Sequence, residues 1–116
     1  ISRGYNFVVF EGVGQNGCLI EYPQKKFIAN YETVISAVID YLIDHFKLFM
    51  SEPQVILYGL SLGGYFALRA AGSDRRVKHL IANPPYLNFG LVQERALGFP
   101  LNRMPHKILD RMVSAI

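Results

Sequence analysis

The sequence of 116 residues lacks the features that mark secreted and membrane proteins. Its single cysteine, Cys18, can form no internal disulfide, which fits a reducing compartment, and we interpret it as an ordinary small apolar residue. No apolar run approaches the roughly 20 residues that span a bilayer, and no basic segment followed by an apolar stretch resembles a signal peptide. We therefore expect a cytoplasmic protein with no membrane span.

The sequence also has no basic stripe and no metal-ligand pattern. Its 12 Lys and Arg residues are scattered among 9 acidic residues, so a net charge of +3 gives little support to nucleic-acid binding. The three histidines are far apart and form no pair with ligand spacing, so we expect neither a metal nor a cofactor. A hydrophobic content of 51% is enough to bury one domain core.

Apolar runs and helical periodicity alternate along most of the chain. Short β-branched or aromatic runs predict buried strands at 5–10, 55–58 and 77–82. Apolar residues three and four apart predict a helix over 31–49, with Asn30 as its N-cap, and a second helix is expected from 62 to 71, ending at Gly72. This order indicates an α/β fold with a parallel sheet in a three-layer α/β/α arrangement.

Two stretches depart from this alternation. The residues from 12 to about 29 are rich in glycine and show no sustained period, so we expect a loop there. Beyond residue 86 the sequence is mixed, with Gly90, Gly98 and Pro100, and a helix is predicted from Pro105 onward.

A serine stands between the second predicted strand and the helix that follows, in Gly59-Leu60-Ser61-Leu62-Gly63. A sharp strand-to-helix turn presents a serine hydroxyl to a base and to a substrate carbonyl, and Gly59 and Gly63 leave room for the close backbone contact that the turn requires. Ser61 is therefore the candidate nucleophile, and the N–H of Leu62 is one candidate donor to an oxyanion. The alternative is that Ser61 only caps the helix.

The segment from Val55 to Tyr65 resembles the nucleophile region of the α/β-hydrolase superfamily. The Glu11-Gly12-x-Gly14 loop is similar to an acidic glycine loop of these enzymes, and the combination most resembles the dienelactone-hydrolase-like and prolyl-oligopeptidase-like branches. The resemblance implies a partial hydrolase core over 1–87 and the start of a helical cap over 88–116.

The resemblance also implies that parts of the machinery lie outside these residues. The superfamily triad runs serine, acid, histidine, with the last two beyond the cap, and the second oxyanion donor precedes the first strand. We therefore interpret the chain as an internal fragment, inactive alone. His45, His79 and His106 are interpreted as structural or solvated, and Asp40 and Asp44 as a solvent-exposed helix face.

The predicted activity is hydrolysis of a carboxylic ester, or of a related acyl or carbon–carbon bond, in a small molecule through an acyl-enzyme on Ser61. Glu11, Gly12 and Tyr65 are candidate pocket residues. One alternative is a non-catalytic protein that keeps the hydrolase scaffold. A second is nucleotide binding by Gly12-x-Gly14-x-x-Gly17, which is disfavoured because the next helix is expected only near residue 30. Unpaired sheet edges would also allow self-association.

Overall fold

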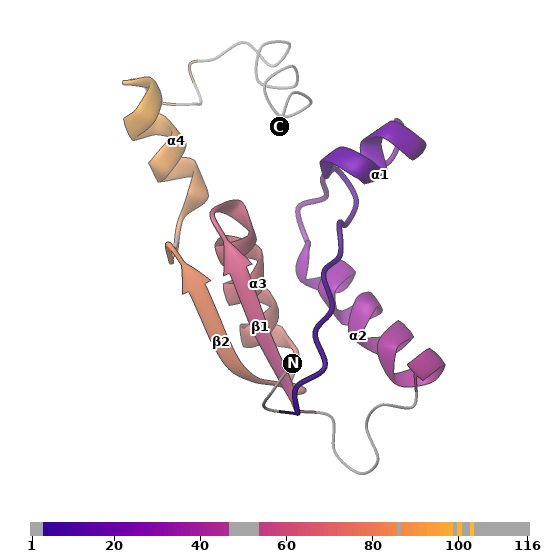
Figure 1. Cartoon of the computed structure of the whole chain (residues 1–116). Coiled ribbons are helices and arrows are strands. Elements are labelled where there is room, and N and C mark those ends of the chain that lie inside the picture. Colours follow the sequence, from indigo (N-terminus) through magenta and orange to yellow (C-terminus); the bar gives the residue numbers. More distant parts are fainter. Residues whose placement is uncertain (1–3, 47–53, 86, 99, 101–102, 104–116) are drawn as a thin grey trace.

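The protein has four helices and two strands in the part of the chain that the computed structural model describes, residues 4–46, 54–85, 87–98, 100 and 103. In order they are α1 (Asn16–Glu21), α2 (Glu32–Phe46), β1 (Val55–Leu60), α3 (Leu62–Ser73), β2 (Val77–Asn83) and α4 (Phe89–Leu97). In Figure 1 the two strands lie side by side, with α3 behind them. This arrangement confirms a partial α/β fold.

The two strands run parallel and are joined through α3. Leu57 of β1 lies opposite Leu80 of β2, and Gly59 lies opposite Ala82. A parallel pair needs a crossover connection, which α3 provides. The carboxyl ends of both strands therefore meet at one edge of the sheet, and Ser61 follows β1 at that edge.

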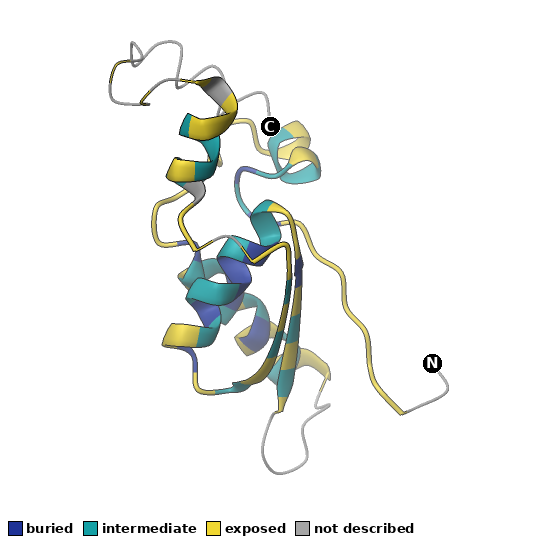
Figure 2. Ribbon diagram, turned by 90° about the vertical axis from the view of Figure 1, so that its left-hand side faces the viewer, coloured by how far each residue is buried: buried dark blue, intermediate teal, exposed yellow. Residues whose placement is uncertain are grey.

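The core lies between the helices and one face of the sheet (Figure 2). Ile35 and Ile39 of α2 are buried against Phe66 and Ala70 of α3, and burial of each large aliphatic side chain stabilises the fold by about 1.5–3 kcal/mol. The opposite face of the sheet is apolar and exposed, through Ile56, Tyr58, Leu60 and Ile81. The described residues thus supply two of the three expected layers.

The strand predicted at residues 5–10 is not formed. The segment has no strand hydrogen bonding, and Figure 2 shows it running apart from the sheet. Its apolar side chains are largely exposed, with 70% for Phe7 and 78% for Val9. An extended segment becomes a strand only when a neighbour satisfies its backbone groups, and none of the described strands does so here.

Other boundaries also differ from prediction. The short helix α1 was not expected, because six residues are too few to show a period. Helix α3 passes through Gly72 to Ser73, and the backbone N–H of Asp74 closes it on Ala70. Helix α4 begins after Asn88 and ends at Gly98, which has a left-handed φ of 74°. The helix predicted from residue 105 lies outside the described residues.

Candidate active site

Ser61 occupies a strained turn between β1 and α3. Its backbone angles are φ 52° and ψ −122°, and among the described residues it alone has a positive φ without being glycine. Such conformations cost about 1–3 kcal/mol and cluster at functional sites, where the surrounding structure holds them in place. The residue is exposed, so the turn presents it to solvent.

Hydrogen bonds on both sides hold this turn, residues 59–64, which we call the elbow. The N–H of Ser61 donates to the carbonyl oxygen of Asn83 at 2.9 Å, and the N–H of Gly64 donates to the carbonyl oxygen of Ser61 at 2.9 Å. The first bond attaches the elbow to the end of β2. The second closes the first turn around the serine.

Only one of the two glycines of the Gly-x-Ser-x-Gly motif is crowded in the way that was predicted. A Cβ on Gly59 would lie 2.5 Å from the carbonyl carbon of Gly63 and 2.7 Å from the nitrogen of Gly64, so glycine is required there. A Cβ on Gly63 would meet nothing within 4 Å, so the predicted crowding at that position was wrong. Gly64 is the second restricted position, because a Cβ there would lie 2.7 Å from the carbonyl oxygen of Pro84.

The start of α3 offers hydrogen-bond donors beside Ser61. Leu62 is the first residue of α3, and the first N–H groups of a helix have no partner within it. The Ser61 side chain makes no capping hydrogen bond to these groups. Its hydroxyl is therefore not engaged in the capping role that the alternative interpretation assigned to it.

Comparison with known proteins gives an independent result. No protein-family model matches the chain, and no solved structure matches it. The hydrolase ORFZ of Pyricularia oryzae is 39% identical over 90 residues, covering 74% of this chain and 21% of that protein. The alpha/beta hydrolase psoB of Aspergillus fumigatus is 36% identical over 115 residues, covering 96% of this chain and 24% of that protein.

The chain belongs to the α/β-hydrolase superfamily. It spans only about a quarter of the length of the curated relatives it matches, which have 21% and 24% of their residues covered. The 20-hydroxy-prefusarin hydrolase FUS2 of Gibberella moniliformis is a further relative, 34% identical over 84 residues, covering 71% of this chain and 20% of that protein. Its name gives 20-hydroxy-prefusarin as the compound that this relative hydrolyses.

Glu11 and Gly12 line a hollow that Ser61 does not line. The carboxylate of Glu11 accepts a hydrogen bond from the N–H of Gly17 at 2.7 Å, and the N–H of Gly12 donates to Gln15 Oε1 at 2.5 Å. Both residues line a hollow of about 730 Å³ between residues 8–13 and α2, and Ser61 does not line it. The described residues therefore do not join these two pocket candidates to the elbow.

The same loop corrects one argument about nucleotide binding. A helix does begin inside the glycine motif, since Gly17 lies in α1, so the expectation of a first helix near residue 30 was wrong. The N–H of Gly17 is nevertheless bound by the acidic Glu11. A negative side chain at this amide opposes the phosphate that a dinucleotide site would place at the helix N-terminus.

Tyr65 lies one turn beyond Ser61 on α3 and is half-buried at the edge of the core. Arg69 donates a hydrogen bond of 3.3 Å from Nη1 to the Tyr65 hydroxyl, and its guanidinium lies 5.7 Å from the centre of the ring. Sequence reasoning missed Arg69 and Asn83, because neither belongs to a motif. Their roles depend on contacts that only the folded chain makes.

Among the described residues, neither the acid nor the histidine that the resemblance implies lies in a hydrogen bond with Ser61. No described histidine or acid forms a hydrogen bond with Ser61, while His45 stacks on Tyr41 and His79 is exposed on β2. His106 lies outside the described residues. Within the part of the chain that the structure covers, no three His, Cys, Asp or Glu side chains gather to hold a metal, and no helix has the length and apolarity needed to cross a membrane.

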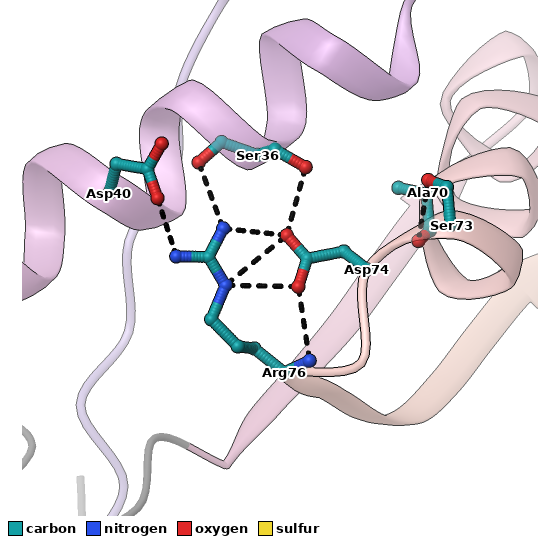
Figure 3. Close-up of polar contacts among 6 residues, drawn as sticks. All are labelled: Ser36, Asp40, Ala70, Ser73, Asp74 and Arg76. Carbon is teal, nitrogen blue, oxygen red and sulfur yellow. Dashed lines mark hydrogen bonds and ion pairs between the residues drawn. The ribbon is translucent and has the colours of Figure 1, made fainter.

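The strongest electrostatic cluster belongs to the scaffold (Figure 3). Asp74 is buried at the end of α3 and accepts hydrogen bonds from Ser36 Oγ at 2.8 Å and from Arg76 Nη2 at 2.7 Å. The hydrogen bonds from the Arg76 side chain hold the pKa of Asp74 far below its ordinary value, because they outweigh the opposing effect of burial. Arg76 also pairs with Asp40, so the cluster ties α2 to the start of β2. Asp40 is thus an ion-pair partner of the scaffold.

Proposed function

We propose that this chain is the nucleophile-bearing part of a longer serine hydrolase that transfers an acyl group from a small molecule to water. Ser61 attacks the carbonyl carbon of an ester or related carbonyl substrate, and the N–H of Leu62 helps hold the resulting oxyanion. The observation that carries this proposal is the strained, exposed backbone of Ser61, which no local capping bond explains.

The base and acid of the mechanism come from outside the described residues in this proposal. Serine needs a histidine to remove its proton, and that histidine needs an acidic partner to orient it. The described histidines make other contacts or lie on β2 away from the elbow. The 116 residues alone should therefore show no esterase activity.

Residues 88–116 begin a cap over the substrate in this proposal. Helix α4 follows β2 at the edge that carries Ser61, and the Asn88 side chain fixes its start by accepting a hydrogen bond of 3.1 Å from the N–H of Leu91. In Figure 1, α4 continues beyond the carboxyl end of β2. Glu11 and Gly12 serve mainly to shape their own loop, whereas Tyr65 lies on the helix that begins directly after the nucleophile.

Hydrolysis of p-nitrophenyl esters by the complete protein tests the proposal. Wild-type protein should turn over these esters, and Ser61→Ala should lower kcat by at least about 10³-fold because the nucleophile is lost. Ser73→Ala is the matched control, since Ser73 is exposed at the far end of α3. Equal rates for wild type and Ser61→Ala would support a non-catalytic scaffold and contradict the proposal.

The open sheet provides a site for self-association. In the described residues β1 pairs only with β2, so its other edge has no partner, and the adjoining face is apolar. Unpaired edges of this kind are templates for a strand from another chain. Sedimentation of the isolated 116 residues should show dimers or larger species, which Tyr58→Lys should reduce; a monomer at all concentrations would contradict self-association.

A further inference from the structure

Three residues form a chain of contacts that leads from the start of α2 to the turn beside Ser61. Glu32 is the first residue of α2, and its Oε1 accepts a hydrogen bond of 2.9 Å from Arg69 Nη2. Arg69 Nη1 donates in turn to the hydroxyl of Tyr65 at 3.3 Å. We call this set of three residues the tyrosine clamp.

The geometry of α3 directs Tyr65 toward the elbow. Side chains of an α-helix lean toward its N-terminus and cover the turn that precedes their own Cα. Tyr65 is the fourth residue of α3 and stands four residues after Ser61, so this lean directs its side chain toward the end of the helix that begins at the nucleophile.

The clamp restricts the Tyr65 ring at two points. The guanidinium of Arg69 binds the hydroxyl and also lies 5.7 Å from the ring centre, so both the tip and the face of the ring are in contact. The centre of the ring also lies 5.8 Å from that of the Phe66 ring, and the two planes meet at 51°. A planar guanidinium can bridge two partners in this way, whereas a lysine ammonium is a single point charge.

The ion pair between Glu32 and Arg69 is less exposed to solvent than a typical surface ion pair. The Glu32 and Arg69 side chains are 24% and 34% exposed, and a second contact of 2.8 Å joins Arg69 Nη2 to Glu32 Oε2. The backbone of Glu32, and then Arg69, keep the pKa of Glu32 below its ordinary value, so the carboxylate stays charged at neutral pH. The clamp thus fixes Arg69 through α2, an element separate from the helix that bears Tyr65.

We propose that Tyr65 determines which acyl groups fit beside Ser61, and that Glu32 and Arg69 are positioning residues that hold its ring in place. This inference rests on the proposed serine hydrolase function. In this proposal the Tyr65 ring limits the size of the acyl part of an ester substrate. Release of the ring would admit longer acyl chains.

The test compares p-nitrophenyl octanoate with p-nitrophenyl acetate in the complete protein. Arg69→Met and Glu32→Gln should each raise the octanoate-to-acetate ratio of kcat/KM by about tenfold, a typical consequence of changing the space in an apolar pocket. Tyr65→Phe keeps the ring but removes the hydroxyl that Arg69 binds, and should move the ratio in the same direction. Arg69→Lys should also raise it, because lysine cannot replace the two-point contact.

A second ion pair of α2, between Asp40 and Arg76, provides the control. Asp40→Asn removes a contact between α2 and Arg76 and should leave the ratio unchanged. An unchanged ratio in Arg69→Met and Tyr65→Phe would overturn the inference. If only their melting temperatures fell, the contacts of Arg69 would contribute to stability and not to the choice of acyl group. A wild-type ratio in Arg69→Lys would also overturn it. Covalent labelling of Ser61 by a fluorophosphonate in the same variants separates these results from a failure of the proposed function.

Discussion

The N–H of Ser61, one residue beyond the end of β1, donates a hydrogen bond of 2.9 Å to the carbonyl oxygen of Asn83, the last residue of β2. Leu60 and Asn83 are already register partners in the parallel sheet, so this bond continues the ladder into the elbow. The strained backbone at Ser61 is therefore supported by the neighbouring strand. This relationship explains why the exposed turn can keep a conformation that is unfavourable for serine.

Substitution of the two glycines in the Gly-x-Ser-x-Gly motif should have opposite consequences. Gly59→Ala places a Cβ within 2.7 Å of backbone atoms of Gly63 and Gly64, and overpacking of this kind should lower the free energy of unfolding by about 1–3 kcal/mol. Gly63→Ala has open space and should be neutral or stabilising by up to about 1 kcal/mol, because alanine favours a helix over glycine. Urea unfolding of both variants measures the difference, and equal losses would contradict the asymmetry.

Removal of the buried carboxylate in the Asp74 cluster should destabilise the fold. Asp74→Asn replaces charge-assisted hydrogen bonds to Arg76 with weaker neutral ones, and we expect a loss of about 2–3 kcal/mol. Asp40→Asn is the matched control, because the Asp40 side chain is 62% exposed and surface pairs contribute less than about 1 kcal/mol. Urea unfolding at pH 7 provides both values. A loss in Asp40→Asn as large as that in Asp74→Asn would be inconsistent with the burial seen here.

The carboxylate of Asp74 should make the free energy of unfolding depend on pH. The pKa of Asp74 is lower in the folded chain than its value of about 3.9 in unfolded chains, so its contribution is complete above that value and is lost as the pH falls toward the folded pKa. The free energy of unfolding should therefore decrease from about pH 5 downward. Denaturation curves at pH 6, 4 and 3 should show a smaller decrease in Asp74→Asn than in wild type, and parallel decreases would contradict this assignment.

Tyr31 should ionise only at strongly alkaline pH. Burial, and secondly the charge of Cys18, raise its pKa to about 12. Its neutral form is thus favoured in the fold, so its contribution to stability is complete below about pH 10 and is lost as the pH rises toward 12. Absorbance titration of the phenolates should show a late transition that Tyr31→Phe removes. A titration unchanged in that variant would count against the buried position of Tyr31.

The sequence was most informative about elements whose structure depends on residues close together in the chain. The strands predicted at 55–58 and 77–82 and the helix predicted between them follow from local apolar pattern and glycine placement. The structure confirms these three elements and extends the strands to 60 and 83. The long helix predicted over 31–49 is present as α2 from Glu32 to Phe46 among the described residues, because its apolar residues recur over four turns. These elements are the ones that place Ser61 at the sheet edge.

Features that depend on distant partners were missed or wrong. Residues 5–10 have the composition of a strand, but a strand also needs a neighbouring strand, which the described residues do not supply. The need for glycine at position 64 comes from the carbonyl of Pro84, twenty residues later, and no local motif encodes it. Helix α1 is fixed in part by Glu11, whose carboxylate binds the N–H of Gly17.

The most direct measurement is mass mapping of the complete protein after treatment with a fluorophosphonate probe. The account predicts one phosphonate adduct on the peptide that contains Ser61, and no adduct in Ser61→Ala. An adduct on another residue, or an unlabelled Ser61 in folded protein that hydrolyses esters, would contradict the assignment of this serine as the nucleophile.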